Sequence, residues 1–325
     1  MKDRIGLSLK GVAMGMAEVV PGVSGGTIAF ITGIYEELID TIKSVDIEFF
    51  KLFFTFKWKA AFEKINGMFL LFLVGGMLLG IVMSLFLVTY LLEHHGEGLW
   101  GFFFGLIIAS SIYIGNKVSS WNIKTISLLL VGAIISYAIT VVTPAGGTES
   151  LFFVFLSGAL AISALILPGI SGSFILLLLG MYSVIIPHVK SLISSPNTHS
   201  LLIVFVFGLG CIAGLGVFSR VLSYAFKEYK DATLAILTGF MIGSLNKIWP
   251  WRNPTRWLDK ETYKTINSAD AAFEDYASIE IKILTESNVM PATYSGDANT
   301  MLVLVSVVLG LLLIFLLAKF EKTGD

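Results

Sequence analysis

Two apolar stretches of the chain carry the same helix-breaking motif, VPGVSGGT at 20–27 and LPGISGSF at 167–174. Proline lacks a backbone donor and glycine relaxes the dihedral limits, so a helix breaks at each motif and a new helix begins at its serine. The first N–H groups of a helix have no intrahelical partner and carry partial positive charge, which favours an anion. Serine hydroxyls add further donors. The motifs therefore predict a binding site for an anionic ligand.

The candidate binding residues surround the two helix starts. A single Pro-Gly motif is explained equally well by a simple kink in a long helix. Two copies with the same Ser-Gly spacing favour a site formed by discontinuous helices. The residues are Gly22, Ser24, Gly25, Gly26 and Thr27 in the first motif and Gly169, Ser171, Gly172 and Ser173 in the second.

Glu18 precedes the first break by three residues. At 1.5 Å per residue it lies about 18 Å along a helix that starts near residue 6, which is close to the bilayer midplane. A carboxylate at that depth is costly, so Glu18 is a candidate for coupling, either protonated or paired with a cation. The alternative is a neutral, hydrogen-bonded side chain that ties the hairpin to a neighbouring segment. Leu165 holds the equivalent place in the second motif, which makes any coupling role one-sided.

Arg220 is the only basic residue within an otherwise uncharged span. Its guanidinium could pair with Glu18 or bind a phosphate through two hydrogen bonds. The alternative is that the long side chain reaches the membrane surface near Lys227, seven residues further on.

The composition identifies the class of protein that must position these residues. The chain has 325 residues, 55% of them hydrophobic and 14% charged, and its mean hydropathy is +0.84. A soluble domain has about 25% charged residues, so a soluble globular protein is excluded. Several uncharged runs reach the roughly 20 residues that a helix needs to cross a bilayer. The net charge of −1 gives no reason to expect a nucleic-acid partner.

The chain contains an internal duplication. An offset of 147 residues aligns the two motifs and the segments that follow them, and an offset of 134 aligns the next two hydrophobic segments. Glycines at i, i+4 spacing within this repeat are interpreted as close helix contacts. The aligned identities include Pro21/Pro168, Gly33/Gly180, Tyr35/Tyr182, Lys43/Lys190, Gly76/Gly210 and Gly80/Gly214.

The predicted fold is an all-α polytopic membrane protein, an inverted internal repeat in which each half is a re-entrant hairpin broken at Pro-Gly plus three transmembrane helices. The first repeat covers 1–145, with the hairpin at 5–42, an interfacial segment at 45–66 and spans at 67–92, 99–115 and 125–142. The second covers 146–325, with the hairpin at 151–189 and spans at 201–226, 232–248 and 299–318. An inserted extracytoplasmic loop at 249–299 is polar and is expected to form a surface loop or small cap.

The distribution of basic residues predicts the orientation. With the N-terminus inside, the cytoplasmic side holds most Lys and Arg, whereas the short outer loops at 93–98 and 143–150 hold none. Both termini are therefore expected in the cytoplasm. Three spans per half require the second half to be inverted, which brings the two breaks toward each other near the midplane. Short hairpin arms favour re-entry over full crossing, and full crossing leaves this orientation unchanged.

The paired P-G-[VI]-S-G motifs, each followed by G-[IM]-Y, resemble the bacterial polyprenyl-phosphate transporter family, long known as a membrane domain of unknown function. The resemblance implies a flippase in the bacterial cytoplasmic membrane that returns undecaprenyl phosphate from the outer to the inner leaflet for cell-envelope synthesis. It also implies two re-entrant hairpins in an inverted repeat. Polyprenyl phosphate and membrane lipid are the expected partners, no cofactor or metal is expected, and a homo-oligomer and a coupling proton or sodium ion stay open.

Other functions remain as alternatives. The nearest is a channel or secondary transporter for a small inorganic anion, which would use the same helix starts. An intramembrane enzyme is disfavoured, because the spans contain no histidine and no paired carboxylates for catalysis or metal binding. A structural or assembly protein would tolerate any helix-breaking substitute at the motifs.

Overall fold

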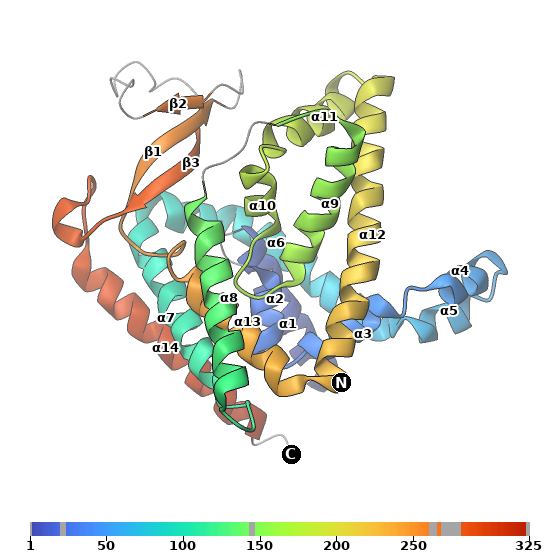
Figure 1. Ribbon diagram of the computed structural model, residues 1–325, viewed down its shortest axis with the longest axis horizontal. Coiled ribbons are helices and arrows are strands. Elements are labelled where there is room, and N and C mark those ends of the chain that lie inside the picture. The colour runs from blue at the N-terminus through green and yellow to red at the C-terminus, as the bar shows by residue number, and fades with distance from the viewer. Residues whose placement is uncertain (1, 20–23, 143–146, 260–264, 268–280, 323–325) are drawn as a thin grey trace.

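The computed structural model describes residues 2–19, 24–142, 147–259, 265–267 and 281–322, which form helices and one small sheet (Figure 1). The first part of the chain forms α1 (Lys2–Val19), α2 (Gly25–Ile31), α3 (Tyr35–Lys43), α4 (Ile47–Phe54), α5 (Trp58–Lys64), α6 (Gly67–His94), α7 (Gly96–Gly115) and α8 (Ile123–Val141). The second part forms α9 (Leu151–Ile166), α10 (Gly172–Leu178), α11 (Tyr182–Ser194), α12 (Thr198–Glu228), α13 (Lys230–Ser244), β1 (Arg252–Asp259), β2 (Thr265–Asn267), β3 (Ile281–Asn288), η2 (Pro291–Thr293) and α14 (Thr300–Lys322).

Four helices of the described chain, α6, α7, α8 and α12, are long and apolar enough to cross a bilayer. The pair α10 and α11, bent by 112°, adds a fifth crossing if it is counted as one span. The sequence predicted two more spans, at 232–248 and 299–318. The first of these is the 15-residue helix α13, which ends early because residues 245–248 form turns. The second corresponds to α14, a helix of 23 residues.

Glycines bring equivalent helices into backbone contact in both halves. A Cβ atom on Gly76 of α6 would strike the Ser8 carbonyl oxygen of α1, and one on Gly210 of α12 would strike the Phe155 carbonyl oxygen of α9. Ser8 and Phe155 are related by the offset of 147, and the two glycines by the offset of 134. The close helix contacts that the glycine spacing predicted are therefore present at equivalent places.

Two further helix pairs join the two halves. Gly105 of α7 packs against the carbonyl of Val307 in α14, and Gly239 of α13 packs against the carbonyl of Leu129 in α8. Gly105 and Gly239 are again equivalent positions of the repeat. Thus α7 of the first half is covered by the last helix of the second half, and α13 is covered by α8 of the first.

The two broken helices pack at opposite ends of α12. Lys43 of α3 donates a hydrogen bond of 3.0 Å from Nζ to the hydroxyl of Ser223, near the last turn of α12. His188 of α11 forms a hydrogen bond of 2.9 Å with the hydroxyl of Ser200 in the first turn of α12. The first hairpin therefore returns to one end of this helix and the second hairpin to the other.

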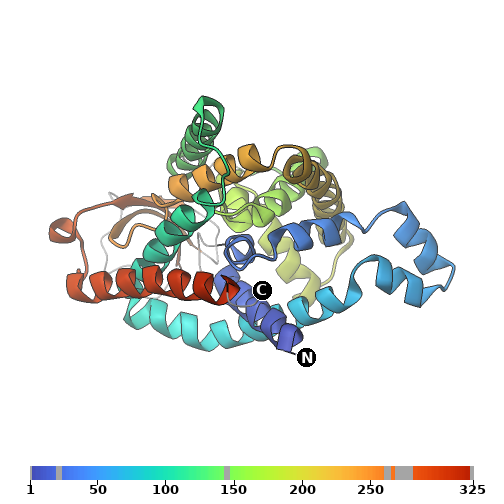
Figure 2. The same cartoon turned by 90° about the horizontal axis from the view of Figure 1, so that it is seen from below.

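Helices α4 and α5 form an arm that projects away from the other helices in both views (Figures 1 and 2). Ile47, Phe54 and Phe56 are strongly exposed on it, and Lys64 pairs with Asp46 at 3.1 Å. The arm coincides with the segment at 45–66 whose mixed aromatic and basic composition predicts an interfacial location.

The inserted segment contains a three-stranded antiparallel sheet in the order β2-β1-β3. The sequence predicted only a polar surface loop or small cap here. The sheet depends on pairing between β1 and β3, whose registers shift near Pro254 and Arg256, and such long-range pairing leaves little local signal. The strand pairing places Arg252 opposite Asn288, beside the end of α13.

Candidate functional site

At the first break, nearby side chains accept hydrogen bonds from the backbone N–H groups that begin α2. Ser24 caps α2, where its Oγ accepts a hydrogen bond of 3.1 Å from Gly26 N. Glu18 Oε1 accepts a hydrogen bond of 2.7 Å from Gly25 N, and Thr27 N donates to Ser24 O at 2.9 Å. The Glu18 carboxylate thus takes the place at the start of α2 that the sequence predicts for an anion. Gly22 lies outside the described residues.

The two breaks lie against each other. Ser24 Oγ donates a hydrogen bond of 2.7 Å to Leu165 O, and Thr27 Oγ1 accepts one of 3.0 Å from Gly169 N. The Tyr35 hydroxyl donates to the carbonyl of Ile166 at 3.1 Å. These side chains satisfy backbone groups that the broken helices leave without intrahelical partners. In the first half, therefore, Ser24 and Thr27 join the two breaks.

At the second break, fewer of the described backbone N–H groups that begin the next helix, α10, have hydrogen-bond partners. Leu165 replaces Glu18 there, and Ser171 Oγ makes a hydrogen bond of 3.0 Å with Ser173 Oγ. Gly169 has a φ of +84°, and a Cβ at this position would lie 2.8 Å from Phe240 O, so glycine is required on both counts. Within the described residues, the amide groups of Gly172 and Ser173 have no hydrogen-bond acceptor.

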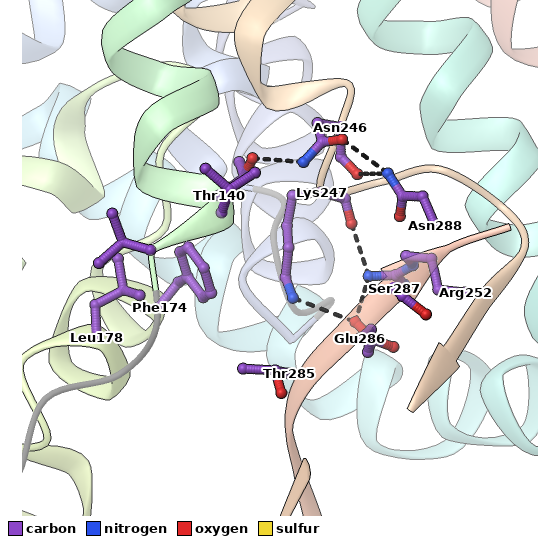
Figure 3. Close-up of a pocket in the computed structure, with 12 residues that line it drawn as sticks. Thr140, Phe174, Leu178, Asn246, Lys247, Arg252, Thr285, Glu286, Ser287 and Asn288 are labelled. Carbon is purple, nitrogen blue, oxygen red and sulfur yellow. Dashed lines mark hydrogen bonds and ion pairs between the residues drawn. The ribbon is translucent and has the colours of Figure 1, made fainter. Parts of the chain in front are cut away.

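A small hollow lies beside Ser171 and is lined by Gly169, Phe174, Thr140 of α8 and Lys247. A larger cavity, with a volume of about 230 Å³, shares the last three of these residues (Figure 3). The sheet closes this larger cavity on its other side. The second break therefore adjoins a polar cavity next to the sheet.

Two cations and one carboxylate line the larger cavity, which we call the sheet cavity. Glu286 Oε2 lies 3.2 Å from Lys247 Nζ and 2.7 Å from Arg252 Nη1 (Figure 3). The side chains of Lys247, Glu286 and Arg252 are 18%, 14% and 6% exposed. Burial lowers the pKa of Lys247; the Glu286 carboxylate opposes this effect, and the charge of Arg252 adds to it. With all three groups ionised, one positive charge remains unbalanced.

Aromatic rings hold the two cations in place. The guanidinium carbon of Arg252 lies 4.1 Å from the centre of the Trp100 ring, and Lys247 Nζ lies 4.9 Å from the centre of the Phe174 ring. Lys247 and Arg252 were not predicted as site residues from the sequence. Their one local signal is that they flank the aromatic segment WPW at 249–251, at the end of an uncharged run.

Arg220 does not join the two breaks. Its side chain is exposed, and Nη1 donates a hydrogen bond of 2.6 Å to Gly216 O one turn earlier. It lines a shallow hollow with Asp46, Glu48 and Lys51 beside the α4–α5 arm. The pairing of Arg220 with Glu18 is therefore not formed, and the position of Arg220 agrees with the alternative of a side chain that reaches the surface.

Comparison with known proteins places the chain in a family. Residues 14–266 match the family described as undecaprenyl phosphate translocase-like (VCA0040-like). The chain is 41% identical over 308 residues to the polyprenyl-phosphate transporter of Vibrio cholerae serotype O1, a match that covers 93% of this chain and 94% of that protein. It is 34% identical over 254 residues to the polyprenyl-phosphate transporter of Staphylococcus aureus, covering 74% and 85%. No solved structure matches. The chain therefore belongs to the undecaprenyl phosphate translocase-like family of membrane transporters.

Proposed function

We propose that this protein moves polyprenyl phosphate, and undecaprenyl phosphate in particular, from the outer to the inner leaflet of the bacterial cytoplasmic membrane. The observation that carries the proposal is the similarity to a polyprenyl-phosphate transporter along 93% of the chain. Two broken helices that meet among apolar helices suit such a substrate, because irregular backbone at membrane depth is tolerated where it lines a substrate path. Transport returns the lipid carrier to the side where it is used again.

The two halves form an inverted repeat in this proposal. The equivalent glycine contacts, the crosswise pairing of α7 with α14 and of α13 with α8, and the packing of the hairpins at opposite ends of α12 all support it. The distribution of Lys and Arg supports cytoplasmic termini. The sheet then lies on the extracytoplasmic side, since it stands at the opposite end from the start of α1 and the end of α14 (Figure 1).

The phosphate passes between the two breaks. Ser171 and Ser173 supply hydroxyl donors, while Ser24 and Thr27 hold the breaks together. Glu18 is the coupling group, because its carboxylate accepts the hydrogen bond of the Gly25 N–H at the start of α2. Protonation of Glu18 weakens that hydrogen bond and removes a charge that would repel the phosphate. Transport by this route depends on protons.

Leaflet exchange in liposomes tests the proposal. The purified protein is reconstituted, and the exchange of labelled polyprenyl phosphate is compared for wild type, Ser171→Ala/Ser173→Ala and the control Ser163→Ala. Ser163 Oγ donates within its own helix to Ala159 O at 2.7 Å, so its loss leaves the breaks unchanged. We expect exchange by wild type and the control and slower exchange by the double variant. Equal exchange by all three proteins would refute the role of the serines.

The same liposomes distinguish lipid transport from the small-anion alternative. Wild-type protein is expected to carry labelled polyprenyl phosphate and to leave the permeability to inorganic phosphate unchanged. Passage of inorganic phosphate without exchange of the lipid would favour a channel or secondary transporter and would overturn the proposed substrate.

A further inference from the structure

We propose that the sheet cavity is the site at which the phosphate monoester headgroup of the lipid first binds on the extracytoplasmic side, where it displaces Glu286 from Lys247 and Arg252. The inference rests on the proposed function and adds to it a binding site separate from the two breaks. The ligand class is a monoalkyl phosphate whose hydrocarbon tail stays in the lipid.

The charges favour this ligand over the carboxylate that is present. A phosphate monoester carries about −1.5 to −2 charges near pH 7 and three acceptor oxygens. Lys247 and Arg252 both contact Oε2 of Glu286, a single oxygen of a group with one negative charge. A phosphate that replaces Glu286 balances both cations and offers each of them a separate oxygen.

Arg252 has donor capacity that the protein leaves unused. Its Nη1 donates to Glu286 Oε2 and to Lys247 O, both at 2.7 Å. Its Nε is buried and has no hydrogen-bond partner within the described residues. Leaving a donor of a buried charged group unpaired is unfavourable, so the guanidinium of Arg252 lacks an acceptor among the described residues. A phosphate offers three acceptor oxygens to this guanidinium, whereas Glu286 contacts only its Nη1.

The cavity also has an apolar side that suits a lipid. Val141 and Val142, at the end of α8, line the cavity and are 55% and 53% exposed on the outer surface of the protein. Phe174 and Leu178 of α10 complete the apolar wall. A headgroup held by Lys247 can thus leave its tail beside the exposed end of α8, in contact with the bilayer.

The position of Lys247 connects the cavity to the second break. Lys247 lines both the sheet cavity and the hollow beside Ser171. Asn246, the preceding residue, is fixed by hydrogen bonds to Thr140 and Asn288, at 2.6 and 2.8 Å. A phosphate bound by the ammonium group therefore stands next to the hydroxyls that receive it in the next step.

The first half has no equivalent pair of cations. The offset of 134 relates Lys247 to Tyr113 and Arg252 to Val118. The sheet that supplies Arg252 and Glu286 belongs to the inserted segment, which the first half lacks. The site therefore exists on one side of the protein only, as a binding site for lipid that arrives from one leaflet should.

Ligand binding to the full-length protein in detergent tests the site. Tryptophan fluorescence is the readout, because Trp100 stacks on Arg252 and the Trp249 and Trp251 rings lie 5.7 Å apart beside it. Farnesyl phosphate, inorganic phosphate and farnesol are titrated separately. We expect farnesyl phosphate to bind more tightly than either of the others. Equal binding of inorganic phosphate would identify free phosphate as the ligand, and equal binding of farnesol would overturn a headgroup site.

Variants of the cavity sharpen the test. Lys247→Gln should weaken the binding of farnesyl phosphate at least tenfold and Lys247→Arg should retain it, whereas the control Lys190→Gln removes an exposed charge of α11 and should have no effect. Glu286→Gln should bind farnesyl phosphate more tightly than wild type, because the competing carboxylate is gone. A purely structural role for Glu286 would give no such gain.

The outcomes separate this inference from the proposed function. If wild type exchanges polyprenyl phosphate in liposomes but Lys247→Gln binds farnesyl phosphate as wild type does, the site is wrong and the transport function stands. If wild type exchanges no lipid, the proposed function fails, whatever the binding curves give.

Discussion

Replacing Glu18 with glutamine tests whether this carboxylate couples transport to protons. Its Oε1 accepts the hydrogen bond of Gly25 N at 2.7 Å. A hydrogen bond to a charged group contributes about 1.5–3 kcal/mol and a neutral one about 0.5–1.5 kcal/mol. Glutamine has nearly the same shape and also accepts a hydrogen bond. The variant is therefore expected to lose about 1 kcal/mol of stability and to remain folded.

Translocation is then measured in liposomes at a series of pH values. Wild type should translocate labelled polyprenyl phosphate faster as the pH falls, because protonation of Glu18 releases the start of α2. Glu18→Gln cannot take up the proton and should give a rate that does not vary with pH. Glu36→Gln is the control, since Glu36 forms an exposed ion pair with Lys230 at 3.1 Å. A Glu18→Gln protein with the pH dependence of wild type would refute the coupling role.

Three further predictions concern the contacts that hold the fold, each measured by thermal unfolding in detergent. Gly76→Ala places a methyl group against the backbone of α1 and should cost about 1–3 kcal/mol, whereas Gly75→Ala, with no atom within 4 Å of the added Cβ, should not; equal melting temperatures would contradict the close contact. Tyr35→Phe removes the donor to the carbonyl just before the second break and should cost about 1–3 kcal/mol, so an unchanged melting temperature would count against this link. Two backbone N–H groups of the α7–α8 turn hold the pKa of the Asp231 carboxyl below its usual value. The ionised carboxylate therefore stabilises the fold at pH values above the usual pKa, and this stabilisation is lost as the pH falls through the lowered pKa. Asp231→Asn should remove this acid sensitivity, and a variant with the same acid profile as wild type would exclude it.

Local sequence signals predicted the elements that depend on local chemistry. Pro168 and the glycines near it predicted the second break, and the spacing of Gly76 and Gly210 predicted the helix contacts. Both features depend directly on residue type, because proline and glycine set the backbone geometry and glycine permits close packing. The repeat also implied that the two breaks approach each other, and Ser24 Oγ of the first break donates a hydrogen bond to Leu165 O beside the second. For Glu18, the sequence offered coupling or a tie to a neighbouring segment; its carboxylate accepts a hydrogen bond from Gly25 N within the same hairpin, and the coupling role stays a prediction.

Features that depend on long-range pairing were not predicted. In the sheet, β1 pairs with β3 across more than twenty residues, and its local pattern is interrupted by Pro254. Lys247 meets Glu286 across 39 positions of the chain, so no spacing in the sequence announces the pair. The span predicted at 232–248 also extends past α13, which ends at Ser244 before the turns at 245–248.

The central claim is that this chain carries polyprenyl phosphate across a bilayer. The most direct measurement places fluorescent polyprenyl phosphate in one leaflet of liposomes that contain the wild-type protein and follows its protection from a membrane-impermeant quencher over time. We expect protection to develop faster than in protein-free liposomes and a fluorescent polyprenol without phosphate to show no such acceleration. Equal rates with and without the protein would contradict the account.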